Sequence, residues 1–451
     1  MHDTITIALG LASFDVTHEP KTVLSVGGQK VTLTRGRITE ELLRTCPHCG
    51  QAMDIHQEHE VTLKHIPLQM RPHLLRVSRK RVRCRGCGYL QMQNIPFKDP
   101  EHRMTKHLRY LVERRLSEGY TLKAVSRDLG VHPSIVKEVD KSRLLRMFPT
   151  KRPDKYSEYI AIDEFLLLRG HRYATVVLDL SEGHVIWCSE GKKKQQVADF
   201  IQDMGEDWMR HVKAVSMDMN AQYDSAFREL CPWIAVIYDA FHLVKLYNDR
   251  VLTAMRRRKQ NELAEEGDQK GYQLYKGSRY IVLSDRKTLQ QKDEKARENN
   301  RMLDAMTLRG KKWPAGARKM NASNERRLDE LLGVNDDLNK AYFLLDQLKA
   351  AFQETDPKSL FRGLRQWLHM AFESGVQEVV AFARTIRKRI RSLVQHAIHP
   401  ISSGKLEGTN NLIKTIRRQA YGFRDTEYFF LKIKEASRKP YYQYQSHRIL
   451  S

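Results

Sequence analysis

Short apolar runs occupy the chain between residues 159 and 239. Apolar residues dominate 159–165, 171–180 and 184–190, and glycine-containing turns separate some of these runs, which predicts three consecutive strands. The pattern then changes to an amphipathic helix at 192–205, a strand at 212–219, a short helix at 222–230 and a strand at 233–239. A three-stranded meander followed by alternating helices and strands predicts a mixed sheet covered by helices.

The flanking regions have different patterns. Residues 61–68 and 73–84 predict strands before the sheet, and residues 104–147 predict helices. After it, residues 241–400 are almost wholly helical in pattern, with amphipathic segments at 336–354, 358–373 and 376–396 and a polar, charge-rich stretch at about 256–325. The chain is therefore expected to be a multidomain α+β protein.

Two cysteine pairs stand among the early strands. Cys46 and Cys49, and likewise Cys84 and Cys87, are separated by two residues and followed by glycine. That spacing lets both thiolates of a pair reach one tetrahedral Zn²⁺, and the glycine allows the turn behind them. We expect a zinc ribbon holding one structural Zn²⁺. Histidines 48, 56, 59 and 65 are alternative ligands that four cysteines make unnecessary.

Residues 121–139, TLKAVSRDLGVHPSIVKEV, have the pattern of a helix-turn-helix. Gly130 lies in the turn and Pro133 suits the first turn of the second helix. His132, Ser134 and Lys137 would then face a DNA major groove. Such patterns also occur in proteins that bind no DNA.

Composition indicates a polyanionic partner. The 451 residues carry a formal net charge of +24, which favours nucleic acid and, less well, an anionic membrane surface. No apolar run reaches the roughly 18 residues of a spanning helix, and no export signal precedes the cysteines. We expect a cytoplasmic protein that acts on DNA or RNA and does not bind membranes.

Two carboxylates occur in predicted apolar strands, where a charged side chain is unusual. Asp163 is within the first strand and Asp218 ends the fourth. In a ribonuclease H-like sheet these strands are neighbours, and two carboxylates in near-contact repel each other unless a cation lies between them. Mg²⁺ or Mn²⁺ suits oxygen ligands and phosphate chemistry. The alternative is that each aspartate only caps a strand end.

A third carboxylate, Glu407, stands in the basic window 402–422. On a helix, Asn411, Lys414 and Arg418 would share its face, with Arg417 beside them. This face suits a metal ion held beside a phosphate backbone, although a solvated basic helix with one stray acid is the plainer interpretation.

The chain resembles the DDE transposases of bacterial insertion sequences, in the ISL-three group. The resemblance covers nearly the whole chain and is carried by the two cysteine knuckles, the strands AIDEF and VSMDMN, the segment YDAFH and the run SGKLEGTNNLIKTIRRQAYGF. It implies a catalytic triad of Asp163, Asp218 and Glu407.

The resemblance also implies the domain order. We expect a zinc-ribbon domain over 1–100, a helix-turn-helix over 101–150, a ribonuclease H-like core beginning at 151–240, a mostly helical insertion over 241–400 and the final catalytic helices over 401–451.

The implied reaction is cleavage at the element's terminal inverted repeats and strand transfer into target DNA by a homodimer. The triad would hold two Mg²⁺ or Mn²⁺ ions. Lys414, Arg417 and Arg418 would hold phosphates, and Asp239, His242 and Asn411 would support the acids. Two alternatives are a DNA-binding regulator derived from such an enzyme and a metal-dependent nuclease that does not join strands.

Overall fold

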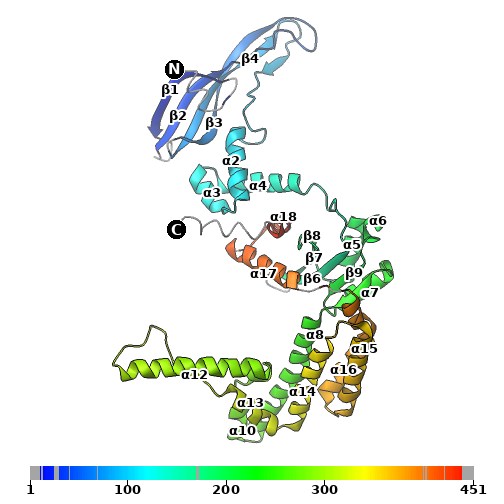
Figure 1. The fold of residues 1–451 in the computed structure, drawn as a ribbon. Helices are drawn as coiled ribbons and strands as arrows, with labels where there is room; N and C mark the ends of the chain where they lie inside the picture. The colour runs from blue at the N-terminus through cyan, green and yellow to red at the C-terminus, as the bar shows by residue number, and fades with distance from the viewer. Residues whose placement is uncertain are drawn as a thin grey trace. The chain divides into compact units, whose positions relative to one another are not determined.

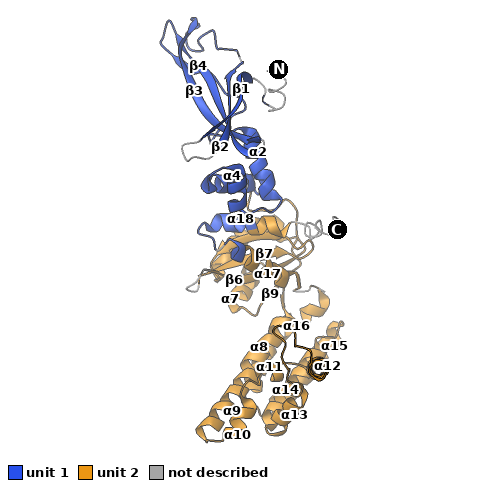
Figure 2. Cartoon of the chain, turned by 90° about the vertical axis from the view of Figure 1, so that its left-hand side faces the viewer, with its two compact units in different colours: residues 1–149, 417–432 blue, residues 150–416, 433–451 orange. Residues whose placement is uncertain are grey.

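The computed structural model describes residues 11, 14–24, 30–39, 41–68, 70–168, 172–399, 401, 404–420 and 422–438. The chain divides into two compact units (Figure 2), of which unit 1 comprises Met1–Pro149 and Arg417–Lys432 and unit 2 comprises Thr150–Ile416 and Ile433–Ser451. Residues 402, 403, 421 and 439–451, all within the predicted final segment 401–451, lie outside the described residues.

A five-stranded sheet begins unit 1. Its strands are β1 (Phe14–Leu24), β2 (Lys30–Ile38), β3 (Met53–Leu68), β4 (Arg71–Cys84) and β5 (Leu90–Met92). The order is β1-β2-β4-β3, with β5 paired to β4. β3 begins eight residues before the predicted strand at 61–68, because its polar first half is held by cross-strand contacts such as the hydrogen bond from Ser78 to Glu58, 2.6 Å.

Three helices follow the sheet in unit 1 (Figure 1): α2 (Lys106–Ser117), α3 (Leu122–Leu129) and α4 (Pro133–Met147). Thr121 caps α3 by accepting a hydrogen bond from the Ala124 N–H, and Gly130 ends it in the left-handed conformation, φ 64°. Val112, Val125 and Val136 lie in the core that the three helices share. The two predicted helices at 121–139 and the glycine turn between them are present.

A buried charge holds the segment 417–432 against α4. Asp140, fully buried, accepts hydrogen bonds from Arg143 at 2.6 Å and from the Tyr428 hydroxyl at 2.6 Å, and Lys432 lies 3.2 Å away. Burial opposes ionisation of Asp140, but Lys432, Arg143 and Tyr428 outweigh it and lower its pKa. Leu144 packs on Tyr428 beside this network.

Unit 2 is built on a second five-stranded sheet. Its strands are β6 (Tyr159–Leu168), β7 (Arg172–Asp179), β8 (Val185–Glu190), β9 (Ala214–Met217) and β10 (Ala235–Tyr238), in the order β10-β9-β6-β7-β8. β6, β7 and β8 form an antiparallel meander, whereas β9 runs parallel to β6 and β10 parallel to β9. The predicted adjacency of the strands that carry Asp163 and precede Asp218 is confirmed.

The helices of unit 2 fall into two groups. Those interleaved with the strands are α5 (Lys194–Met204), α6 (Glu206–Met209) and α7 (Ala221–Leu230). Those between β10 and α17 (Gly404–Gln419) are α8 (Ala240–Tyr247), a π-helical turn (Asn248–Leu252), α9 (Thr253–Glu265), α10 (Gln269–Tyr275), α11 (Arg279–Val282), α12 (Arg286–Leu308), α13 (Asn324–Gly333), α14 (Asp336–Ala351), α15 (Pro357–Glu373) and α16 (Gln377–Ile398). No helix among the described residues is long and apolar enough to cross a membrane.

Helix α12, of 23 residues, extends from the helical group (Figure 1). It lies in the region predicted to be mostly helical, but its bounds were not predicted within the polar, charge-rich stretch at about 256–325. Its apolar stripe is narrow. One member of that buried face is an acid, Asp293, which accepts hydrogen bonds from the backbone N–H groups of Asn324 and Glu325 at the start of α13. Apolar periodicity does not predict a buried acid whose role is to cap a neighbouring helix. The last helix of the chain is α18 (Thr426–Ser437).

We predict that Tyr428→Phe lowers the free energy of unfolding of the chain by about 1.5–3 kcal/mol, because a hydrogen bond to a buried charge is lost. Chemical denaturation monitored by circular dichroism measures this change. Tyr110→Phe is the matched control, since Tyr110 on α2 is 67% exposed, and it should change stability by less than about 0.5 kcal/mol. Equal effects of the two variants would contradict a role for Tyr428 at Asp140.

Candidate active site and cysteine cluster

Asp163 is a buried acid on the central strand β6. It is 8% exposed, between the fully buried Ile162 and the half-buried Glu164. Its Oδ1 accepts a hydrogen bond from the Glu164 N–H at 2.7 Å, and its Oδ2 accepts one from the Asn410 amide at 2.6 Å. Both carboxylate oxygens are therefore fixed in direction.

Asp218 lies beside Asp163 because of strand register. Ile162 of β6 pairs with Met217 of the parallel strand β9. Asp163 follows Ile162 and Asp218 follows Met217, so the two aspartates are neighbours. Burial, and after it the charge of Asp218, raises the pKa of Asp163 to about 6. A buried acid, Asp163, is thus held beside the half-exposed Asp218, at a free-energy cost that a bound cation would relieve.

His242 lies between Asp218 and a third acid. Its Nδ1 is 2.6 Å from Asp218 Oδ1 and 2.7 Å from Asp239 Oδ2. Asp239 ends β10, is 8% exposed, and caps α8 by accepting the Phe241 N–H. The carboxylates of Asp218 and then Asp239 raise the pKa of His242 to about 10, so the ring is charged at neutral pH. Of the two residues predicted to support the acids, His242 contacts Asp218 and Asp239 contacts His242; their supporting role stays a prediction.

The donor set fits a divalent cation. The carboxylates of Asp163, Asp218 and Asp239, together with the His242 imidazolium, leave a net charge of about −2 at neutral pH. Two buried oxygens, Asp218 Oδ1 and Asn410 Oδ1, have no hydrogen-bond partner among the described residues. The Asp218 oxygen is in ion contact with the His242 ring, 2.6 Å away. Hard oxygen atoms beside surplus negative charge are suited to Mg²⁺ or Mn²⁺.

Helix α17 brings Glu407 to this side of the sheet. The helix is attached at two points: Lys405 donates hydrogen bonds to the backbone carbonyls of Leu180 and Ser181, at 2.7 and 2.6 Å, and Asn410 donates to Asp163. Glu407 precedes Asn410 by three residues, so the two side chains are neighbours on one helical face. The Glu407 side chain is exposed.

The three acids of the predicted triad are not all in mutual contact. Within the described parts of the chain, the groups whose potential ligand atoms all lie within 4.8 Å of one another are the four cysteines and the set of Asp99, Glu101 and His102. The oxygens of Asp163, Asp218 and Glu407 do not meet that distance. The acid set at Asp99 has a structural explanation, because Arg109 lies 2.8 Å from Asp99.

Sequence analysis selected Asn411 and overlooked its neighbour. Asn411 is exposed, whereas Asn410 is half-buried and bonded to Asp163. Both asparagines are compatible with the face of Glu407, at three and four residues' separation, so periodicity could have nominated either. Lys414 and Arg418 are exposed, as the predicted basic face requires, and Arg417 is half-buried.

The residues predicted to face DNA have contacts of their own in unit 1. His132 caps α4, accepting the Ser134 N–H at 3.3 Å and bonding the Ser134 hydroxyl at 2.8 Å. The Lys137 ammonium lies 3.0 Å from Asp425, and Lys141 also pairs with that acid. DNA contact by Lys137 would require it to leave Asp425, and such contact by these residues stays a prediction.

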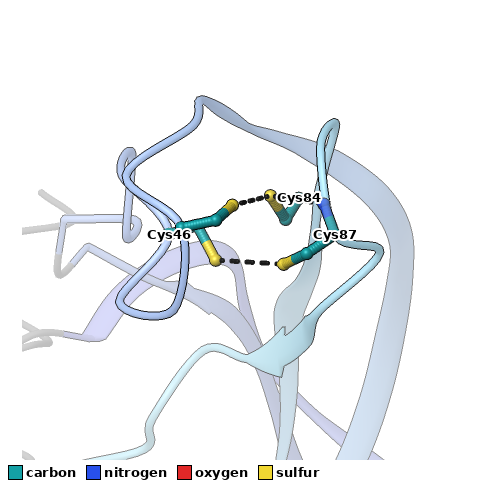
Figure 3. A group of neighbouring side chains, drawn as sticks. Cys46, Cys84 and Cys87 are labelled. Atoms are coloured by element: carbon teal, nitrogen blue, oxygen red, sulfur yellow. Dashed lines mark hydrogen bonds between the residues drawn. The ribbon is translucent and has the colours of Figure 1, made fainter.

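The four paired cysteines converge on one point (Figure 3). Sγ of Cys46 is 3.6 Å from that of Cys87, and Sγ of Cys49 is 3.3 Å from that of Cys84. Tetrahedral Zn²⁺ with Zn–S bonds of about 2.3 Å requires separations of about 3.8 Å. The N–H groups of Cys87 and Gly86 point at Cys84 and lower its pKa to about 6, which favours the thiolate that binds metal.

We predict that the chain binds one structural Zn²⁺ at these cysteines. Cys84→Ser should remove it, because three thiolates bind far more weakly than four. Elemental analysis after dialysis measures the zinc content. Cys188→Ser is the matched control, since Cys188 stands on β8 in unit 2, and it should keep the metal. Zinc retained by Cys84→Ser would contradict the assignment.

Comparison with known proteins agrees with this architecture. Residues 160–433 match the family model of ISL3-type DDE transposases, described as a transposase, and residues 43–87 match the zinc-finger of the transposases of IS204, IS1001, IS1096 and IS1165. The transposase for insertion sequence element IS1001 of Bordetella parapertussis is 30% identical over 397 residues, covering 87% of this chain and 88% of that protein.

A further relative is the transposase for insertion sequence element IS1557 of Mycobacterium tuberculosis, which is 26% identical over 286 residues, 61% of this chain and 60% of that protein. The zinc-finger model, which matches residues 43–87, spans the four cysteines. The transposase model, which matches residues 160–433, spans Asp163, Asp218 and Glu407. The chain therefore belongs to the ISL3 group of DDE transposases of insertion sequences.

Proposed function

We propose that this chain cuts DNA at the ends of its insertion sequence and joins those ends to target DNA, using Asp163, Asp218 and Glu407. The observation that carries the proposal is the pair of acids on neighbouring parallel strands, with α17 attached to one of them through Asn410. A structural protein has no need to bury Asp163, at 8% exposure, next to Asp218 when no lysine or arginine in the described part of the chain is bonded to it.

Asp163, Asp218 and Glu407 would hold two Mg²⁺ or Mn²⁺ ions. Bound there, the ions supply Lewis acidity and lower the pKa of an attacking water or 3′-hydroxyl. Asp163 would be the central ligand, since Asp218 follows the adjacent strand and α17 is bonded to the Asp163 Oδ2 through Asn410. Asp218 and Glu407 would complete the oxygen ligands.

The neighbouring residues orient these acids. Protonated His242 holds Asp218 Oδ1 and is itself held by Asp239, so Asp218 is directed by a charged contact. On the exposed face of α17, Lys414 and Arg418, with Arg417 beside them, would hold backbone phosphates in line with the acids. Phosphodiester transfer of this kind needs no covalent link between protein and DNA, so no serine or tyrosine nucleophile is required.

Unit 1 would recognise the terminal inverted repeats. Its zinc ribbon carries the basic strand β4, with Arg79, Lys80, Arg81 and Arg83, and α3 and α4 have the form of a helix-turn-helix whose second helix enters a major groove. His132 and Ser134 stand at the exposed start of α4. Lys137 would join them if it exchanged Asp425 for a phosphate. Because two ends must be joined, we propose a homodimer on DNA.

The test is a strand-transfer assay with purified protein, Mg²⁺, a labelled duplex of the element's own end and a target plasmid. Asp163→Asn, Asp218→Asn and Glu407→Gln should each lose cleavage and joining by on the order of 10³-fold, since several kcal/mol of metal-derived stabilisation disappear. Asp336→Asn is the matched control: this acid of α14 has a side chain that is 77% exposed and pairs with Lys340, and its variant should keep activity.

Each other outcome has a defined meaning. Cleavage without joined products in the wild type would favour the nuclease, and specific binding without cleavage would favour the regulator. Full activity of Glu407→Gln would exclude Glu407 from the reaction and overturn the triad.

We predict that Lys414→Ala and Arg418→Ala each weaken binding of duplex DNA irrespective of sequence and reduce the slope of log K against log salt by about 1. Fluorescence anisotropy at several salt concentrations measures the slope. Arg326→Ala removes the same charge from α13, where Arg326 pairs with Glu330, and should leave the slope unchanged. An unchanged slope in the α17 variants would show that these cations do not contact phosphate.

A further inference from the structure

One side chain joins the helix of Glu407 to the strand of Asp163. The Asn410 Nδ2 donates to Asp163 Oδ2 at 2.6 Å, a bond between residues 247 positions apart in the chain. The recipient is 8% exposed, and its other oxygen is occupied by the Glu164 N–H. Asn410 therefore sets the direction of the Asp163 oxygen that a backbone group does not hold.

The bond also fixes the rotation of α17. Lys405 attaches the first turn of the helix to the carbonyls of Leu180 and Ser181, and Asn410 attaches the second turn to β6. Two attachments about one and a half turns apart prevent the helix from rotating about its axis. Glu407 lies between these two attached residues in the sequence, three residues before Asn410, so the two attachments also fix its place on the helix.

We propose that Asn410 is a positioning residue of the active site: through its amide donor it orients Asp163 and holds the Glu407 helix against the Asp163 strand, which makes the acids ready to bind metal. This inference rests on the proposed function, because it assumes that Asp163 and Glu407 are ligands. It concerns a residue that acts through Asp163 and not a ligand in its own right.

An ordinary packing role does not explain the arrangement. The buried side of the same helix carries the apolar Leu406 and Ile413 and also Thr409, whose hydroxyl is satisfied within the helix by the Lys405 carbonyl. Instead an amide is placed with its oxygen buried and without a hydrogen-bond partner among the described residues, an unfavourable state that is tolerated for the bond made by its nitrogen.

The test is the Mn²⁺ affinity of the zinc-loaded full chain without DNA, measured by electron paramagnetic resonance of free Mn²⁺. Asn410→Leu keeps the approximate volume and removes the donor, and it should weaken Mn²⁺ binding by about 10–100-fold, as the loss of a group that orients a metal ligand does. Asn410→Gln keeps an amide donor and should recover part of that loss. The thermal midpoint of unfolding is recorded for each variant.

Thr415→Ala is the matched control. Thr415 is exposed on the same helix, and its hydroxyl donates only to the Asn411 carbonyl one turn earlier, so Mn²⁺ affinity should not change. Asp163→Asn provides the reference for a lost site.

The outcomes separate the two proposals. Mn²⁺ binding that survives Asp163→Asn would overturn the proposed function. Mn²⁺ binding that is lost in Asp163→Asn but unchanged in Asn410→Leu would overturn the role of Asn410 alone. A weakened site in Asn410→Leu that Asn410→Gln does not restore, together with an equal fall in thermal midpoint for both, would reduce Asn410 to a packing residue and also contradict the proposal.

Discussion

Electrostatic repulsion between two carboxylates is the constraint on which the rest of unit 2 depends. Parallel pairing of β6 with β9 places Asp163 and Asp218 side by side, and burial raises the free energy of charging Asp163. The positive charge of protonated His242 offsets part of the repulsion between the carboxylates. The net negative charge that remains can be balanced by a bound cation. Helix α17 then returns to the sheet after the long helical segment and supplies Glu407. The sheet order, the return of the chain and the family assignment agree on one place for the chemistry.

Much of this site could be predicted from local sequence. The strands are short apolar runs with period-two character, so the meander and the two parallel strands follow from patterning, and the adjacency of Asp163 and Asp218 follows from their order. The cysteine knuckles are equally local, because two residues of spacing determine whether two thiolates can share an ion. In both cases the information lies within a few residues, and tertiary packing does not overrule it.

What the sequence did not determine depends on partners far away in the chain. Whether Asn410 or Asn411 faces the acids is a matter of 100° of helix rotation, which is set by the attachment of Lys405 to the turn after β7. Lys137 was expected to face DNA, and its pairing with Asp425 arises from a segment 288 residues later that packs on α4. The bounds of helix α12 could not be predicted within the polar stretch, because its buried face includes Asp293, an acid that caps α13. Strand register, helix rotation and helix-capping partners all depend on tertiary contacts.

Under the proposed function, the buried Asp163, the half-exposed Asp218 and the exposed Glu407 form one site for divalent cations in unit 2. The most direct measurement is the anomalous difference map of crystals grown with Mn²⁺ at a wavelength near its absorption edge. The account predicts two peaks that share Asp163 as a ligand, with Asp218 bound to one ion and Glu407 to the other. Peaks that lack Glu407, or a map with no density at Asp163 while Zn²⁺ occupies the cysteines, would contradict it.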